Sequence, residues 1–128
     1  MSELKRLVQA TRNSMAGLGF AIRDEQAFRS QLIVLAVLIP AAIWLASSTL
    51  ELLALLASAL LVLITELLNT AVEAVVDRAS PDIHPLAKKA KDCGSAAVFV
   101  AMMLTLLVWG LLLWDKFAGP LWVSYSPT

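Results

Sequence analysis

The sequence predicts an all-α membrane protein, in which an N-terminal amphipathic surface helix precedes three transmembrane helices. Three observations support this fold class. Hydrophobic residues make up 59% of the 128 residues, above the roughly 45–50% of soluble domains. The apolar residues gather in three long stretches, each long enough for a membrane span once its flanks are included. Basic residues are concentrated on alternate connections between these stretches, which is typical of membrane proteins.

We expect one membrane domain over the whole chain. The expected segments are a surface helix at about 1–26, transmembrane helices at about 28–49, 50–77 and 93–116, and a tail at 117–128. In the first segment, apolar residues recur at helical spacing while lysine and arginine occupy other positions, as in helices that lie on a membrane surface. The first span contains Pro40, and neighbouring helices can tolerate the kink that a proline causes there.

The basic residues also predict the orientation. Five lie before or at the start of the first span and four between the second and third: Lys5, Arg6, Arg12, Arg23 and Arg29, then Arg78, Lys88, Lys89 and Lys91. The turn SSTLE between the first two spans has none. The positive-inside rule therefore places the N-terminus and the second loop in the cytoplasm and the C-terminus outside. In that loop, Ser80-Pro81 and His84-Pro85 interrupt helical structure.

A polar stripe crosses the second predicted span, which is otherwise apolar. Glu66, Asn69, Glu73 and Asp77 are spaced i, i+3, i+7 and i+11, so at about 100° per residue the other three fall within roughly 60° of Glu66. Ionisable residues inside a membrane usually face a bundle interior or a wet cavity and mark a functional site. Two other interpretations remain open here: side chains that only join helices by hydrogen bonds, or an ion path in a small transporter.

The depth of each carboxylate suggests separate roles. Counted from Leu50, Glu66 lies roughly 24 Å along the helix, just inside the cytoplasmic edge of a hydrocarbon core about 30 Å thick. Glu73 lies about 10 Å farther, near the headgroups or in water. Glu66 would thus meet a lipid headgroup hydroxyl, where it suits a general base, and Glu73 would meet a water-soluble reagent.

Composition and motifs exclude several classes of site. The formal net charge is zero, so there is no basic surplus for nucleic-acid binding. A single cysteine, Cys93, allows no intrachain disulfide, and a single histidine, His84, allows no His-based metal site. No phosphate-binding loop of the GxxxxGK[ST] type is present. Gly94 and Ser95, near the start of the third span, would permit a close approach of two helices.

The segments DEQAF, ELLNTAVEAVVDR and AKDCGSAAV, with a histidine between the last two, resemble the prokaryotic diacylglycerol kinase family. NSMAGL in the first helix adds to the likeness, which covers about residues 5–116. The resemblance implies a small three-span membrane kinase that transfers the γ-phosphoryl group of ATP to the primary hydroxyl of a lipid alcohol. It also implies a homotrimer in a bacterial inner membrane, with sites built between subunits at the cytoplasmic face.

The resemblance implies a role for each candidate residue. Glu66 corresponds to the general base, and Asn69 to the residue that orients this base and the acceptor. Glu25 and Glu73 correspond to the carboxylates that hold the Mg²⁺ bound to ATP. The implied ATP contacts are Arg6, Glu25, Glu73, Asp82, Ile83, His84, Lys91 and Asp92. The implied lipid contacts are Ser14, Glu66, Asn69 and Ser95.

The expected acceptor is diacylglycerol and the expected product phosphatidic acid, because EAVVDR and LLLWDKF favour that branch of the family. An undecaprenol kinase, which uses the same machinery on a polyprenol, is the alternative within the family. A small transporter or channel subunit is the alternative from another class, and it predicts ion flux without nucleotide. Asn13, Met15 and Cys93 depart from the common family pattern. These departures concern the surface-helix contacts rather than the centre at Glu66 and Glu73.

Overall fold

The computed structural model describes residues 2–79, 81, 82 and 84–119. These residues form four α-helices and no strand: α1 (Glu3–Asp24), α2 (Gln26–Leu45), α3 (Thr49–Ala79) and α4 (Pro85–Phe117). Helices α2, α3 and α4 are long and apolar enough to cross a membrane. The predicted all-α membrane fold, with one helix ahead of three spans, is confirmed. Most of the predicted tail, from residue 120 onward, lies outside the described residues.

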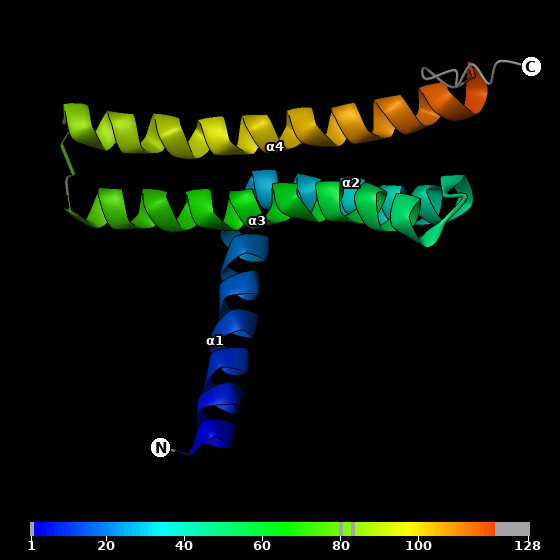
Figure 1. The fold of residues 1–128 in the computed structure, drawn as a ribbon. Coiled ribbons are helices and arrows are strands. Elements are labelled where there is room, and N and C mark those ends of the chain that lie inside the picture. The colour runs from blue at the N-terminus through cyan, green and yellow to red at the C-terminus, as the bar shows by residue number, and fades with distance from the viewer. Residues whose placement is uncertain (1, 80, 83, 120–128) are drawn as a thin grey trace, which may run out of the picture.

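Helices α2, α3 and α4 run along one direction, and α1 runs across it (Figure 1). Helix α3 packs against both α2 and α4, so it is the central helix of the bundle. Apolar side chains of α1 are open to the surroundings: Leu4 is 71% exposed, Leu7 65% and Met15 59%. An amphipathic helix that crosses the bundle direction in this way is suited to lie in the surface of a membrane that the other three helices span.

A sharp elbow at Glu25 joins α1 to α2. The backbone of this residue is extended (φ −114°, ψ 107°), which ends α1 and starts α2. Arg29, one turn into α2, reaches back and donates hydrogen bonds of 2.9 Å from Nη1 to the carbonyls of Ile22 and Arg23. The last carbonyls of a helix lack partners within it, and cations stabilise that end. Arg29 therefore fixes the elbow at which Glu25 lies.

Polar side chains of α4 tie it to the backbone of α3 inside the apolar region. Trp109 Nε1 donates to the carbonyl of Leu55 (3.2 Å), and Thr105 Oγ1 donates to the carbonyl of Ser58 (2.9 Å). Such interhelical hydrogen bonds stabilise bundles in membranes, where burial of apolar surface gives no driving force. Helix α2 joins the same region through a buried cluster of Ala42, Leu45 and Leu55. The central helix is thus held by both of its neighbours.

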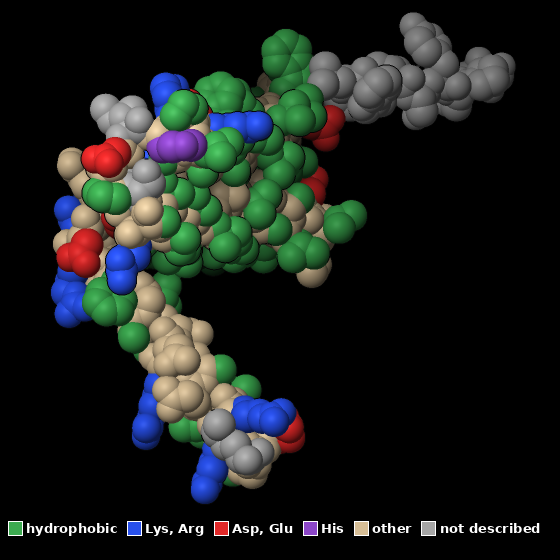
Figure 2. All heavy atoms as spheres, turned by 90° about the vertical axis from the view of Figure 1, so that its left-hand side faces the viewer, with side chains coloured by type: hydrophobic (Ala, Val, Ile, Leu, Met, Phe, Trp, Pro, Cys, Tyr) green, Lys and Arg blue, Asp and Glu red, His purple; other side chains and the backbone are tan. Residues whose placement is uncertain are grey.

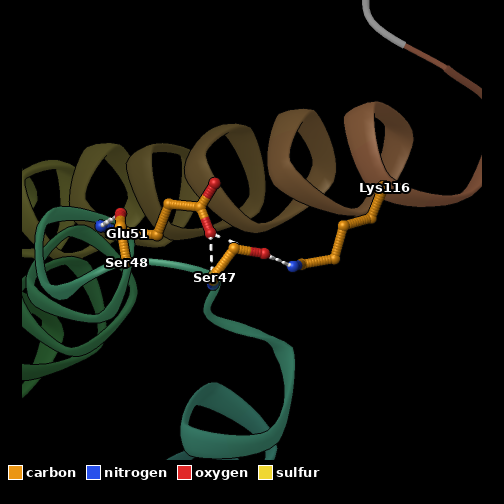
Figure 3. A network of polar contacts seen from close by, with 4 residues as sticks. All are labelled: Ser47, Ser48, Glu51 and Lys116. Carbon is orange, nitrogen blue, oxygen red and sulfur yellow. Dashed lines mark hydrogen bonds and ion pairs between the residues drawn. The ribbon is translucent and has the colours of Figure 1, made fainter.

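A small polar network holds the end of the bundle at the α2–α3 turn (Figure 3). The Glu51 carboxylate accepts from the backbone N–H of Ser47 (2.6 Å), and the Ser48 hydroxyl accepts from the N–H of Glu51 (3.1 Å). Lys116, near the end of α4, donates to the Ser47 hydroxyl and lies 4.0 Å from the Glu51 carboxylate. The network joins the turn to the end of α4.

Candidate active site

The candidate site lies at the other end of the bundle, where α3 and α4 extend past the start of α2 (Figure 1). Figure 2 looks onto this end, where acidic, basic and histidine side chains gather in front of an apolar bundle. His84 starts α4: its Nδ1 accepts from the N–H of Leu86 (3.1 Å), and Pro85 follows at the first helical position, which proline favours. The charged residues at this end therefore lie on α3, on α4 and in the connection between them, which ends at the N-cap residue His84.

A cleft of about 620 Å³ opens between the end of α1 and one face of α3. Four carboxylates line it: Asp24 and Glu25 come from the elbow, and Glu73 and Asp77 come from α3. Small residues make room for the cleft, namely Gly17, Ala21, Ala71 and Ala74. Glu25 and Glu73, which are 48 positions apart in the sequence, therefore face the same space.

Exposure to solvent rises along the polar stripe of α3. Glu66 is buried, with 7% of its surface exposed. Asn69 and Glu73, the next two members, are half-buried, and Asp77 is exposed. The stripe therefore leads from an enclosed carboxylate to an open, charged cleft.

Asn69 links these two environments. Its Nδ2 donates to Glu73 Oε1 over 3.3 Å. Its Oδ1 is buried and has no hydrogen-bond partner among the described residues. This oxygen faces Gly94 of α4. Asn69 thus contacts the cleft carboxylate on one side and α4 on the other.

A second cleft, of about 270 Å³, lies between the end of α3, the connection and the start of α4. Its polar lining consists of Asp77, Asp82, His84, Lys88, Lys91 and Asp92. Lys91 Nζ lies 2.5 Å from Asp77 Oδ1, and Lys88 Nζ lies 2.5 Å from Asp92 Oδ2. Asp77 lines both clefts, so it stands on the wall between them.

The structure gathers only part of the predicted site within one chain. Arg6 pairs with Glu3 (3.1 Å) near the start of α1, and the Ser14 hydroxyl donates to the carbonyl of Ala10 (2.9 Å). The start of α1 points away from the bundle (Figure 1), and neither residue lines the two clefts. Ser95 is exposed on α4 and lines neither of them. Ile83 lies outside the described residues.

Two residues with a part in this geometry carried no assigned role in the sequence. Arg29 counted only as one more basic residue, yet it fixes the elbow that carries Glu25. Asp77 stood on the stripe with no catalytic role, expected only to pair with Arg78 or a loop lysine, and it pairs with Lys91 across α3 and α4. The i+11 spacing placed Asp77 on the correct face, but its partner is on another helix, which spacing within one helix cannot reveal.

The geometry agrees with the similarity of the chain to known proteins. Residues 12–113 match the profile of a family described as prokaryotic diacylglycerol kinase. This chain belongs to that family. The diacylglycerol kinase of Pseudomonas aeruginosa is 49% identical to it over 110 residues, covering 86% of this chain and 89% of the relative. The diacylglycerol kinase of Haemophilus influenzae is 42% identical (84% and 91% covered), and that of Escherichia coli K12 is 39% identical (88% and 92% covered).

Membership of the prokaryotic diacylglycerol kinase family confirms that the chain is a lipid kinase. Three helices suited to span a membrane make it a multi-pass membrane protein. A kinase requires a nucleotide co-substrate, and phosphoryl transfer is normally assisted by a divalent cation.

The acidic cleft fits a metal that arrives with a nucleotide. Among the described residues, no group of three or more His, Cys, Asp or Glu side chains is placed to hold a metal ion alone. Mg²⁺ in nucleotide sites usually takes only one or two carboxylates, with phosphate oxygens and waters as its other ligands. Of the four carboxylates that line the cleft, Glu25 and Glu73, one from the elbow and one from α3, would provide that number. Such a pair of carboxylates is compatible with a metal that phosphate oxygens also hold.

Proposed function

We propose that this kinase phosphorylates diacylglycerol to phosphatidic acid with ATP, at the cytoplasmic face of a bacterial inner membrane. The observation that carries the proposal is the gradient along α3. A buried carboxylate, Glu66, lies on the same helix face as a half-buried one, Glu73, which lines an open acidic cleft. Such a site can receive a membrane-bound alcohol from one side and a water-soluble nucleotide from the other.

In this proposal Glu66 acts as the general base. Its carboxylate accepts the proton of the primary hydroxyl as the oxygen of that hydroxyl attacks the γ-phosphorus. The bond between the γ-phosphorus and the bridging oxygen breaks, and ADP leaves with that oxygen. Asn69 orients Glu66 and the acceptor. Ser14 and Ser95 complete the proposed contacts to the lipid.

The nucleotide is proposed to bind across the two clefts. Glu25 and Glu73 would hold Mg²⁺, which supplies neutralisation of phosphate charge. Lys91 would contact phosphate, and Asp92 would lie nearer to the nucleoside. The remaining proposed contacts are Arg6, Asp82, Ile83 and His84. Asp82 and His84 line the second cleft, whereas Glu25 and Glu73 line the first, and this spread across Asp77 suits a long ligand such as ATP.

We also propose that the active unit is a homotrimer. Arg6 and Ser14 stand on the part of α1 that extends away from its own bundle (Figure 1). Contacts from that part of α1 to a nucleotide or lipid are therefore expected in the site of a neighbouring subunit. A single chain leaves the acidic cleft open on one side, and a neighbour would close it.

The test of the proposed function is an acceptor assay. Purified protein in mixed micelles receives ATP labelled at the γ-phosphate, together with diacylglycerol or undecaprenol. We expect label on diacylglycerol, dependent on Mg²⁺, and little on the polyprenol. Label mainly on undecaprenol would show that the acceptor is the polyprenol and not diacylglycerol. Label on neither lipid would contradict the proposed reaction.

A further inference from the structure

Gly94 of α4 lies directly against Asn69 of α3. A Cβ atom placed on Gly94 would overlap Asn69 Oδ1 and lie 3.3 Å from its Cγ. The other glycines within the described helices behave differently: a Cβ atom on Gly17, Gly19 or Gly110 would meet nothing within 4 Å. Among these four helical glycines, Gly94 is the only one whose surroundings leave no room for a larger side chain.

This contact accounts for the orientation of Asn69. The carboxamide donates from Nδ2 to Glu73, and its buried Oδ1 has no N–H or O–H partner in the described part of the chain. Because Oδ1 occupies the direction in which a Cβ atom would project, it faces a Cα hydrogen of Gly94. Weak Cα–H···O contacts of this kind recur where helices pack closely. Any other residue at position 94 would replace that hydrogen with carbon and displace the carboxamide.

We propose that Gly94 is a positioning residue that sets the carboxamide of Asn69, and through it the geometry of Glu66 and Glu73. The proposal rests on the proposed function, in which Asn69 orients the base and the acceptor. A methyl group at position 94 forces Asn69 to rotate or α3 to move away from α4. A displacement of about 1 Å near reacting groups can cost about 100-fold in rate.

The first test observes Asn69 directly. The chain has two asparagines, Asn13 and Asn69, so protein labelled with ¹⁵N in asparagine side chains gives two amide signals. The Asn69→Ala variant assigns them. We expect Gly94→Ala to shift the Asn69 signal and leave the Asn13 signal unchanged. Gly110→Ala, the matched control on the same helix, should leave both unchanged. An unshifted Asn69 signal in Gly94→Ala would overturn the proposal, whatever the kinase activity.

The second test is kinetic. Gly94→Ala should lower kcat by about 100-fold, and Gly110→Ala should leave kcat unchanged. In the Asn69→Ala background, Gly94→Ala should have no further effect on kcat, because the carboxamide it displaces is absent. The same fractional loss in both backgrounds would show a role in general helix packing and overturn the proposal.

Failure of the proposed role of Asn69 can be distinguished from failure of the proposed role of Gly94. If Asn69→Ala keeps full turnover, the proposed role of Asn69 fails, while the amide signal still decides whether Gly94 positions it. If Gly94→Ala does not fold, the double variant Gly94→Ala/Asn69→Ala should fold, because the overlap is removed. If the double variant also failed to fold, the result would contradict the contact between Gly94 and Asn69.

Discussion

Glu66 and Glu73 are two turns apart on α3 and have different surroundings. Glu66 is 7% exposed, whereas Glu73 lines the open cleft opposite Glu25. A carboxylate with little access to water suits proton transfer in an enclosed site. A carboxylate in an open acidic cleft suits the binding of a hydrated cation with its phosphates. The same chemical group is therefore suited to two different purposes according to its depth.

Replacing Glu73 should affect the nucleotide more than the chemistry. We expect Glu73→Gln to raise the KM for Mg·ATP by about 10–100-fold, the range typical of metal sites that lose an important group. Steady-state rates over a range of Mg·ATP concentrations measure it. Glu51→Gln, on the same helix at the opposite end, is the control and should leave this KM unchanged. An unchanged KM in Glu73→Gln would place the metal elsewhere.

Asp77 should act through Lys91. The pair is 2.5 Å apart, with side chains 63% and 43% exposed, and exposed ion pairs contribute little, about 0.2–1 kcal/mol. In Asp77→Asn, Lys91 loses the carboxylate that holds its side chain in position for phosphate. We therefore expect the KM for ATP to rise about two- to fivefold with kcat nearly unchanged. Asp115→Asn, at the other end of the molecule, is the control. A lower KM in Asp77→Asn would mean that Asp77 competes with phosphate for Lys91.

At the scale of residues, the sequence predicted what depends on a single helix. The stripe of Glu66, Asn69 and Glu73 follows from spacing alone, and its rising exposure follows from helix rise and membrane thickness. For Gly94, the sequence predicted only that two helices could approach each other closely there. Its contact with Asn69 depends on the register between α3 and α4, which no pattern within one helix determines.

At the scale of elements, the elbow between α1 and α2 determines how the cleft is built. Arg29 donates to two carbonyls that lie six and seven positions earlier in the chain. This spacing is longer than the i+3 and i+4 contacts of a continuous helix, so it exists only because the chain turns at Glu25. Because Arg29 holds this end of α1, Asp24 and Glu25 lie beside α3.

Loosening the elbow should weaken metal–nucleotide binding. We expect Arg29→Met to raise the Mg²⁺ concentration for half-maximal rate by about three- to tenfold, the effect of losing a well-placed cation at a helix end. Titration of the rate with Mg²⁺ at constant ATP measures it. Lys116→Met loosens the network at the opposite end of the bundle and is the control. It should lower the temperature of thermal inactivation and leave the Mg²⁺ requirement unchanged. The same Mg²⁺ requirement in Arg29→Met and wild type would contradict the elbow's role.

The element pattern was readily predicted because membrane spans have strong compositional signals. The structure places α2 and α3 over Gln26–Leu45 and Thr49–Ala79 and starts α4 at Pro85, well before the apolar stretch. The N-cap of His84 and the first-position proline explain this early start. A break between the surface helix and the first span was expected near residue 27, and the structure has it at Glu25. The sharp turn there and its Arg29 contacts could not be predicted, because the sequence DEQAF contains no glycine or proline to mark a turn.

At the scale of the whole molecule, the apolar surface is the main feature that one chain leaves open. Ile33, Val37, Phe99 and Leu106 are 61–68% exposed. In a membrane, lipid chains or other subunits cover such surfaces. The acidic cleft is open as well, and α1 extends away from it. These features support the proposed trimer, whose contacts the sequence of one chain could not specify.

We propose that the molecule brings a membrane alcohol and a nucleotide to opposite ends of one polar stripe, with Glu66 as the base. The most direct measurement compares transfer and binding in Glu66→Gln. We expect kcat for diacylglycerol phosphorylation to fall by about 10²–10⁴-fold, the usual contribution of a general base. The Kd for Mg·ATP, measured in the same micelles, should change little. Near-normal turnover in Glu66→Gln would contradict the claim.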